Sequence, residues 1–242
     1  MKRITDIILS FFGLILFAPI LLFFIFLIYK QDKSNPFYVS DRIGLLNKPF
    51  RMIKLRSMIK NADTTGVDST SADDCRITPV GHIIRRYKLD EVMQLWNVLK
   101  GEMSIVGPRP NVKRDVNLYT DIETGLLRVR PGITDFSSIV FSDEGEILKG
   151  LDDPDLAYNQ LIRPWKSRLG LVYIDNQNFL LDLRLMLYTF ISLFSRKKSL
   201  KYIQKELVKI QVDTELIKIS GRKVKLYPVA PPGASSIVVA RK

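Results

Sequence analysis

The longest hydrophobic run of the chain lies near its start. Residues 7–29 are 23 consecutive residues without a charged side chain. As a helix this run would extend about 35 Å, which exceeds the ~30 Å hydrocarbon core of a bilayer. It is also longer than the apolar part of a secretory signal peptide, and no small-residue cleavage motif follows it. The pattern therefore predicts a membrane-inserted segment.

The flanks of this run, and a proline inside it, predict how it meets the membrane. Lys2 and Arg3 precede the run, and Lys30 and Lys33 follow it. Positive charge favours the cytoplasmic side, so both ends are expected to face the cytoplasm. Pro19 favours a kink or a break near the middle. A re-entrant helix–break–helix satisfies both features, and a straight span with a tolerated proline is the alternative.

Shorter periodic segments follow. Residues 35–58 predict two short strands around a turn at residues 44–49. Residues 88–100 have apolar positions at the spacing of a helix, and Gly101 supplies a stop. Residues 179–198 repeat that spacing, and this amphipathic helix either lies at the membrane interface or packs as an ordinary core helix. The fold class expected from these elements is α+β, mostly helical, with a small β-hairpin.

Charge divides the chain further. Residues 196–242 hold twelve Lys and Arg against three acids, so this segment carries +9 of the formal net charge of +12. A basic extension of this kind serves anionic lipid, RNA or solubility. Because it offers few aromatic platforms beyond Tyr202 and Tyr227, nucleic acid is not an expected partner. We expect a membrane segment at 1–33, a cytosolic domain at 34–195 and a basic C-terminal extension at 196–242.

Several common site types are excluded by composition. Cys75 is the only cysteine and His82 the only histidine, so one chain offers neither a disulfide framework nor a cysteine- or histidine-rich zinc site. A single cysteine fits a reducing, cytosol-facing compartment. The sequence also lacks a P-loop, a dinucleotide-binding glycine motif and a serine-nucleophile motif.

Two adjacent carboxylates, Asp90 and Glu91, open the helix predicted over 88–100. Acids at this position complement the partial positive charge of a helix N-terminus, which is the ordinary structural explanation. Neighbouring helical residues point about 100° apart, so a shared-proton dyad is disfavoured. The favoured geometry has one carboxylate facing a substrate atom while the other holds a divalent cation such as Mg²⁺.

Basic side chains surround these acids in the sequence. Some precede them, and others lie on the predicted hairpin or in proline-bounded turns, where the backbone is rigid. Arginine matches phosphate with a planar fork of donors. Together with the acids, they indicate a magnesium-assisted reaction on a phosphate ester. The candidate substrate-binding cations are Arg42, Lys54, Arg86, Arg109 and Arg130.

Several motifs, in order, resemble the bacterial sugar transferases, which are small monotopic phosphoglycosyl transferases. The resemblance runs from Lys2 to about Phe194 and leaves the basic extension outside. Besides the basic-then-apolar start with its proline, the motifs are DRIG (41–44), KLRSM (54–58), LDE (89–91), LWNVLKGEMSIVGPRP (95–110), RVRPGIT (128–134) and FLLDLRLM (179–186).

The resemblance implies an activity. Asp90 would be the nucleophile that attacks the sugar-linked phosphate of a UDP-sugar and expels UMP, while Glu91 would bind Mg²⁺. Undecaprenyl phosphate, or another polyprenyl phosphate, would then take the sugar phosphate from Asp90. This is the initiating step of bacterial exopolysaccharide, capsule, O-antigen or glycoprotein glycan assembly.

The resemblance also implies an architecture. The expected protein has a re-entrant membrane helix–break–helix, a β-hairpin and amphipathic interfacial helices around a compact cytosolic catalytic domain. The protein would lie at the bacterial inner membrane with this domain facing the cytoplasm, and a homodimer is among the assemblies left open. Residues 135–160 and Gly170 depart from the family pattern, which leaves the sugar unspecified. The alternative function is a catalytically silent membrane-bound interaction module that recruits partners through its basic extension.

Overall fold

The structure is a computed structural model that describes residues 1–62 and 69–240. It is mostly helical with four short strands, which confirms the expected α+β class. The strands are β1 (Phe37–Ile43), β2 (Pro49–Leu55), β3 (Ser104–Val106) and β4 (Gly132–Thr134). The helices are α1 (Lys2–Asp32), α2 (Pro79–Arg86), α3 (Leu89–Val92), α4 (Gln94–Lys100), α5 (Lys113–Val116), α6 (Phe136–Val140), α7 (Glu144–Ile147), α8 (Pro154–Ala157), α9 (Arg163–Asn176), α10 (Phe179–Phe194), α11 (Arg196–Lys209) and α12 (Thr214–Ser220), with irregular helical turns η1 (Leu45–Asn47), η3 (Glu123–Arg128) and η4 (Tyr158–Ile162).

The predicted hairpin is present. Strands β1 and β2 pair antiparallel, with Tyr38 opposite Lys54 and Arg42 opposite Phe50. Strands β3 and β4 form a separate parallel pair. At the end of this pair the backbone of Gly107 lies against that of Gly132. A Cβ atom on Gly132 would lie only 2.1 Å from the amide nitrogen of Gly107. Only glycine permits this approach, which fixes the start of the proline-bounded turn that follows β3.

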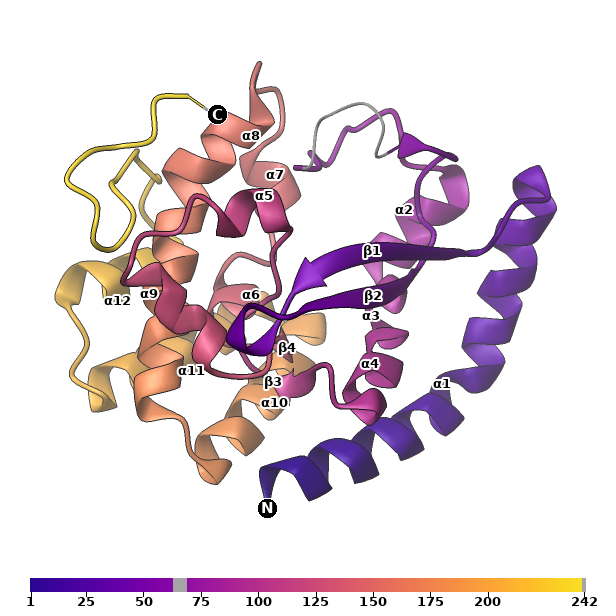
Figure 1. Cartoon of the computed structure of the whole chain (residues 1–242), viewed down its shortest axis with the longest axis horizontal. Helices are drawn as coiled ribbons and strands as arrows, with labels where there is room; N and C mark the ends of the chain where they lie inside the picture. The colour runs from indigo at the N-terminus through magenta and orange to yellow at the C-terminus, as the bar shows by residue number, and fades with distance from the viewer. Residues whose placement is uncertain (63–68, 241–242) are drawn as a thin grey trace.

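Helix α1 is the predicted membrane segment. It is long and apolar enough to cross a membrane. The sequence favours a kink or a helix–break–helix at Pro19, and the structure shows one continuous helix with Pro19 inside it. The helix bends near its middle (Figure 1), as expected where proline removes a backbone donor while the rest of the hydrogen-bond ladder continues. The prediction of a break is therefore corrected to a bend.

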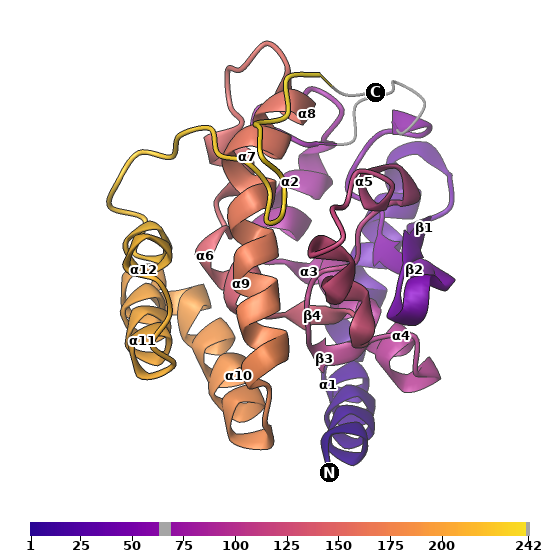
Figure 2. The ribbon, with the colours of Figure 1, turned by 60° about the vertical axis from the view of Figure 1, so that its left-hand side comes forward.

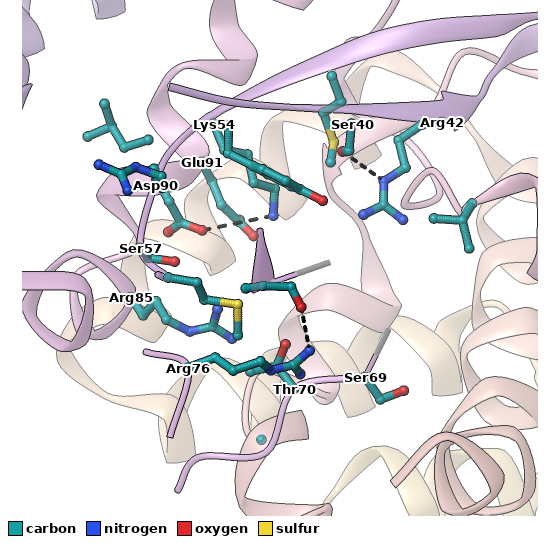
Figure 3. A pocket seen from close by; sticks show the side chains of 18 of the residues that line it. Ser40, Arg42, Lys54, Ser57, Ser69, Thr70, Arg76, Arg85, Asp90 and Glu91 are labelled. Carbon is teal, nitrogen blue, oxygen red and sulfur yellow. Dashed lines mark hydrogen bonds and ion pairs between the residues drawn. The ribbon is translucent and has the colours of Figure 1, made fainter. Parts of the chain in front are cut away.

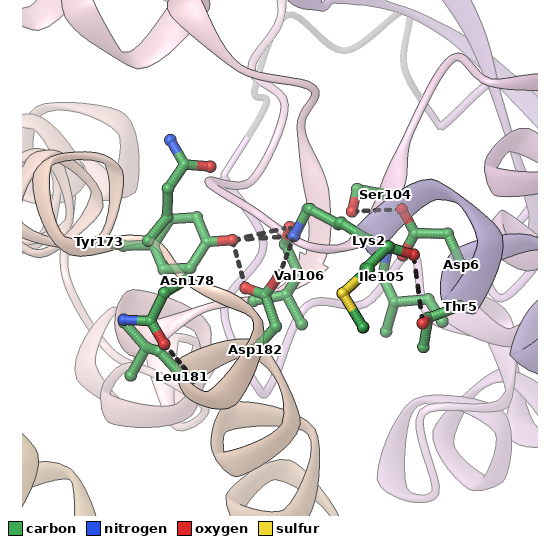
Figure 4. Close-up of polar contacts among 12 residues, drawn as sticks. Lys2, Thr5, Asp6, Ser104, Ile105, Val106, Tyr173, Asn178, Leu181 and Asp182 are labelled. Carbon is green, nitrogen blue, oxygen red and sulfur yellow. Dashed lines mark hydrogen bonds and ion pairs between the residues drawn. The ribbon is translucent and has the colours of Figure 1, made fainter.

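The N-terminal end of α1 is bonded to the rest of the protein. The Lys2 ammonium donates to the Val106 carbonyl at 2.8 Å and the Tyr173 hydroxyl at 3.0 Å, and it pairs with the Asp182 carboxylate at 2.7 Å (Figure 4). The buried Asp6 carboxylate accepts hydrogen bonds from two groups of β3, the Ser104 hydroxyl and the amide of the next residue. These contacts fix the helix start against β3, α9 and α10.

The other end of α1 is also held. Both oxygens of the Asp32 carboxylate accept from the guanidinium of Arg56, at 2.5 and 2.7 Å, just beyond the end of β2. Between the two ends, the inner face of the helix joins a hydrophobic cluster that includes Leu21, Ile28 and Leu55. The outer face is apolar and exposed over most of its length. Both ends of the apolar helix are thus attached to one folded body.

The largest core lies among α6, α9, α10, α11 and α12 (Figure 2). One face of α10 is buried in it, and the opposite face exposes a row of leucines and phenylalanines. Side chains of the C-terminal extension contribute directly to the same cluster. The boundary predicted at 195/196 therefore does not separate two cores. The contributing residues are Leu200, Ile203, Leu207, Leu216 and Ile219.

Beyond α12 the chain returns over α9 and η4. The Val229 amide donates to the Gln160 carbonyl at 3.2 Å, and the Arg168 guanidinium donates to the Ala230 carbonyl at 2.9 Å. Residues 221–240 therefore pack along the body as an irregular strap, and the extension is not simply a solvated basic tail.

Candidate active site

A cavity of about 570 Å³ lies between the β1–β2 hairpin, the α2–α3 corner and the segments around α7 and η4. Charged side chains from distant parts of the sequence point into it (Figure 3). We call Lys54, Asp90, Glu91 and Arg109 the near wall of this cavity.

The two acids of the near wall lie in the first turn of α3. Lys88 precedes the helix with a left-handed φ of 53°, and this sharp corner turns the start of α3 toward the cavity. Asp90 Oδ2 lies 3.9 Å from Lys54 Nζ, whereas Glu91 Oε1 accepts from Arg109 Nη2 at 2.6 Å. The adjacent carboxylates therefore have different cationic partners, in agreement with separate roles for the two acids.

Asp90 and Lys54 share a poorly solvated environment. Burial, and then the nearby Arg109 cation, lower the pKa of Lys54 to about 8 against the opposing effect of Asp90. Burial also raises the pKa of Asp90 above its ordinary value, although Lys54 opposes that shift. A carboxylate that is deprived of water in this way is more basic, and more reactive toward an electrophile, than one in solution.

Glu91 is in the opposite situation. Burial alone would raise its pKa, but Arg109, with help from Lys88, holds the pKa of Glu91 well below its usual range. Arg109 is presented by the rigid turn between Pro108 and Pro110. Glu91 is therefore a permanently ionised oxygen donor.

The predicted cations are divided between the cavity and the surface. Arg42, Lys54 and Arg109 line the cavity, together with Arg85, which the sequence analysis left out of its substrate-binding set. Arg42 donates to the Ser40 hydroxyl at 3.3 Å, within β1. Three of the five predicted side chains are thus gathered around Asp90 and Glu91.

Arg86 and Arg130 do not line the cavity. Arg86 is exposed at the end of α2 with its guanidinium 5.7 Å from the centre of the Tyr87 ring. Arg130 is also exposed, and its Nε donates to the Gly101 carbonyl at 2.9 Å. Arg85 faces the cavity and its neighbour Arg86 does not, because consecutive residues on a helix point in different directions.

Sequence reasoning missed the opposite side of the cavity. We call its side chains Ser142, Glu144, Tyr158 and Lys166 the far wall. Glu144 and Lys166 form an ion pair, and the Lys166 ammonium lies 5.4 Å from the centre of the Tyr158 ring. Burial, and then the Glu144 charge, raises the pKa of the Tyr158 hydroxyl, which therefore stays protonated. The only sequence signal was the departure of residues 135–160 from the family pattern.

The near wall contains oxygen donors for a magnesium ion, but not a closed protein cage. Among residues 1–62 and 69–240, no group of three or more His, Cys, Asp or Glu side chains is arranged to hold a metal. Magnesium often uses one or two carboxylates and takes its other ligands from substrate phosphates and water. The ionised Glu91 fits that arrangement as the single protein ligand.

The sequence model of the bacterial sugar transferase family matches residues 1–196. The chain belongs to the bacterial sugar transferase family. Membership confirms the resemblance seen in the motifs and the prediction of a transferase enzyme. The match ends at the first residue of α11, so most of the C-terminal extension lies outside the family's common core.

Relatives in several bacteria support this assignment. The chain is 34% identical to the uncharacterized sugar transferase EpsL of Bacillus subtilis, covering 78% of this chain and 85% of that protein. It is 36% identical to a UDP-N-acetylgalactosamine-undecaprenyl-phosphate N-acetylgalactosaminephosphotransferase of Aeromonas hydrophila, over 57% of this chain and 34% of that protein. It is 35% identical to a UDP-glucose:undecaprenyl-phosphate glucose-1-phosphate transferase of Klebsiella pneumoniae, over 72% of this chain and 38% of that protein. The chain thus spans about a third of the length of these last two relatives and most of EpsL.

Proposed function

We propose that the protein transfers a sugar-1-phosphate from a UDP-sugar to undecaprenyl phosphate, releases UMP and so initiates glycan assembly. The observation that carries the proposal is Asp90, a poorly solvated carboxylate held 3.9 Å from Lys54 at the edge of a cation-lined cavity. Two relatives whose names specify an undecaprenyl-phosphate acceptor support the choice of lipid.

In the first step, an Asp90 oxygen attacks the phosphorus that carries the sugar. A bond forms between this oxygen and phosphorus while the bond from phosphorus to the UMP oxygen breaks, and UMP leaves. Lys54 and Arg109 face the negative charge of the diphosphate, and such fixed cations stabilise the charge that builds up during phosphoryl transfer. The product is an acyl phosphate, a mixed anhydride between the Asp90 carboxyl group and the sugar phosphate.

In the second step, a phosphate oxygen of undecaprenyl phosphate attacks the same phosphorus. The bond to Asp90 breaks, the carboxylate is regenerated and the lipid diphosphosugar leaves. Splitting one displacement into two lets the water-soluble donor and the lipid acceptor use the same catalytic group at different times. Magnesium, when bound, would offset the diphosphate charge, with Glu91 as its protein ligand.

The arrangement of α1 supports a re-entrant topology, with the catalytic body on the cytoplasmic side of the inner membrane. Lys2 and Asp32 at the two ends of the helix bind the same folded body, while the apolar outer face between them is exposed. A helix attached at both ends to one body, and bent in between, enters and leaves the bilayer by the same face. Lysines flanking both ends agree with a cytoplasmic location for each.

Labelled donor, without any lipid acceptor, tests the covalent step. The protein is mixed with Mg²⁺ and UDP-glucose or UDP-N-acetylgalactosamine labelled in the sugar-linked phosphate. We expect a burst of about one UMP per active site and label retained on the denatured protein. Peptide mapping should place the label on Asp90, and Asp90→Asn should abolish both signals.

A matched control is Asp121→Asn, which makes the same change at an exposed position outside the cavity. It should behave as wild type. If wild-type protein turns over with lipid but retains no label without it, a direct one-step transfer replaces the two-step mechanism. If Asp90→Asn turns over normally, Asp90 is not the nucleophile.

A further inference from the structure

The C-terminal extension touches the back of the cavity through Asp143. This aspartate lies between the two cavity-lining residues Ser142 and Glu144. Its Oδ1 pairs with Arg196 at 2.8 Å, and its Oδ2 pairs with Arg222 at 3.2 Å. Arg196 begins α11 and Arg222 follows α12, so two separate points of the extension converge on one carboxylate.

The same two arginines make further contacts with this segment. Arg196 donates to the Val140 carbonyl at 3.0 Å and to the Ser142 hydroxyl at 3.1 Å. The guanidinium of Arg222 lies 5.4 Å from the centre of the Phe141 ring, and Phe141 is a buried residue that lines the cavity. The contacts therefore cover residues 140–143 in succession, which is more than a single surface ion pair.

Residues 141–145 need external support because they have little regular structure of their own. They comprise the turn after α6, a helix of five residues, and the first two residues of α7, a helix of four. Helices this short are not stable on their own, so packing and side-chain contacts decide their position. On the opposite side the Gly145 carbonyl accepts from the Ala72 amide at 3.0 Å.

We propose that Arg196 and Arg222 are positioning residues through which the C-terminal extension holds residues 141–145 and sets the affinity for the sugar of the donor. The inference rests on the proposed function for the identity of that occupant. The far wall offers a hydroxyl, a phenol and an ion pair, which suit sugar hydroxyl groups, whereas the near wall offers the cations that suit a diphosphate. The extension thus acts on substrate binding without touching the substrate.

Steady-state kinetics of the full-length protein in lipid nanodiscs tests this role, with UDP-glucose and UDP-N-acetylgalactosamine as donors. Arg222→Ala and Asp143→Asn should raise the donor KM about three- to tenfold while kcat and the KM for undecaprenyl phosphate change less than about twofold. The inhibition constant of UMP, which lacks the sugar, should stay at its wild-type value. Arg222→Lys, which keeps the charge near Asp143, should restore part of the donor affinity.

The matched control is Lys209→Ala. Lys209 also belongs to the extension and pairs with an acid, Glu206, at 3.2 Å, but this ion pair lies within α11. This variant loses the same charge and should keep the wild-type donor KM. An unchanged donor KM in both Arg222→Ala and Asp143→Asn, or an equal rise in the donor KM and the UMP inhibition constant, overturns the proposal.

Hydrogen exchange separates this proposal from the proposed reaction because it requires no turnover. The Ile147 amide donates to the Asp143 carbonyl and the Leu148 amide to the Glu144 carbonyl. In Arg222→Ala these amides should exchange several-fold faster than in wild type, and in Lys209→Ala they should not. Unchanged exchange in Arg222→Ala overturns the positioning role whether or not the protein releases UMP. A wild-type protein that releases no UMP contradicts only the reaction.

Discussion

The two walls of the cavity differ in how they are built. The near wall comes from β2, the start of α3 and the turn after β3, and each of its four side chains lies in a short sequence motif. The far wall comes from segments around α7, η4 and α9 and is supported from behind by the C-terminal extension. The near wall has the charges for a phosphate reaction, and the far wall has groups suited to selecting a sugar. We therefore expect substitutions on the near wall to change rate and those on the far wall to change preference.

The largest difference should come from comparing one carboxylate on each wall. Glu91→Gln removes the charge that balances Arg109 and the proposed magnesium ligand, so kcat should fall about a hundred- to a thousandfold. Glu144→Gln should lower kcat/KM less than about tenfold, mainly through KM. UMP release measured over a range of donor concentrations and at several Mg²⁺ concentrations gives kcat and kcat/KM for both variants. Equal losses in the two variants would remove the functional distinction between the walls.

The pH dependence should follow the near wall. With a pKa of about 8, Lys54 is a cation below that pH and loses its proton as the pH rises through it, so kcat/KM should fall about five- to sixfold between pH 8 and 9. On the acid side, Asp90 must be ionised, and activity should fall as the pH drops through its raised pKa. Lys54→Arg should abolish the alkaline fall because arginine stays charged. An unchanged alkaline fall in that variant would exclude Lys54 as its cause.

Arg85 and Arg86 form a natural matched pair. Arg85 lines the cavity and Arg86 is exposed. Arg85→Ala should lower kcat/KM about fivefold through loss of a cation near the diphosphate, whereas Arg86→Ala should change it less than twofold. Initial rates at subsaturating donor measure the difference. A larger loss in Arg86→Ala would favour the original sequence-based choice.

The smallest effect expected is a change in donor preference. Lys166→Met removes the partner of Glu144 on the far wall. The ratio of kcat/KM for UDP-glucose to that for UDP-N-acetylgalactosamine should change about threefold. Glu91→Gln, although much slower, should keep the wild-type ratio. Competition between the two donors in one reaction measures the ratio directly, and a preference that changes only in Glu91→Gln would reverse the assignment of the walls.

The near wall could be predicted because its chemistry is local. Asp90 and Glu91 are adjacent, and the prolines beside Arg109 show a rigid turn in the sequence itself. The sequence did not indicate that Arg85 rather than Arg86 lines the cavity, because the short α2 gives too few residues to establish which side of the helix faces inward. Arg130 also lies beside a proline, but its side chain is exposed and donates to the Gly101 carbonyl.

The far wall and the extension depend on contacts that no local pattern contains. Asp143 is far from Arg196 and Arg222 in the sequence, and only the tertiary packing brings the three side chains together. A signal for the burial of α11 was nevertheless present, since Leu200, Ile203 and Leu207 follow the spacing of a helix. The high lysine content of the extension had suggested a solvated tail. Lysines on one face of a helix are, however, compatible with a buried apolar face on its other side.

The attachment of α1 at both ends has a practical consequence for dissecting the enzyme. A protein cut after residue 33 would lose Lys2, which pairs with Asp182, and Asp32, which pairs with Arg56. It would also expose Leu55, the residue next to Lys54. Removing the hydrophobic helix would thus disturb the strand that carries a reactive cation. We therefore expect a protein that lacks α1 to lose UMP release as well as membrane binding.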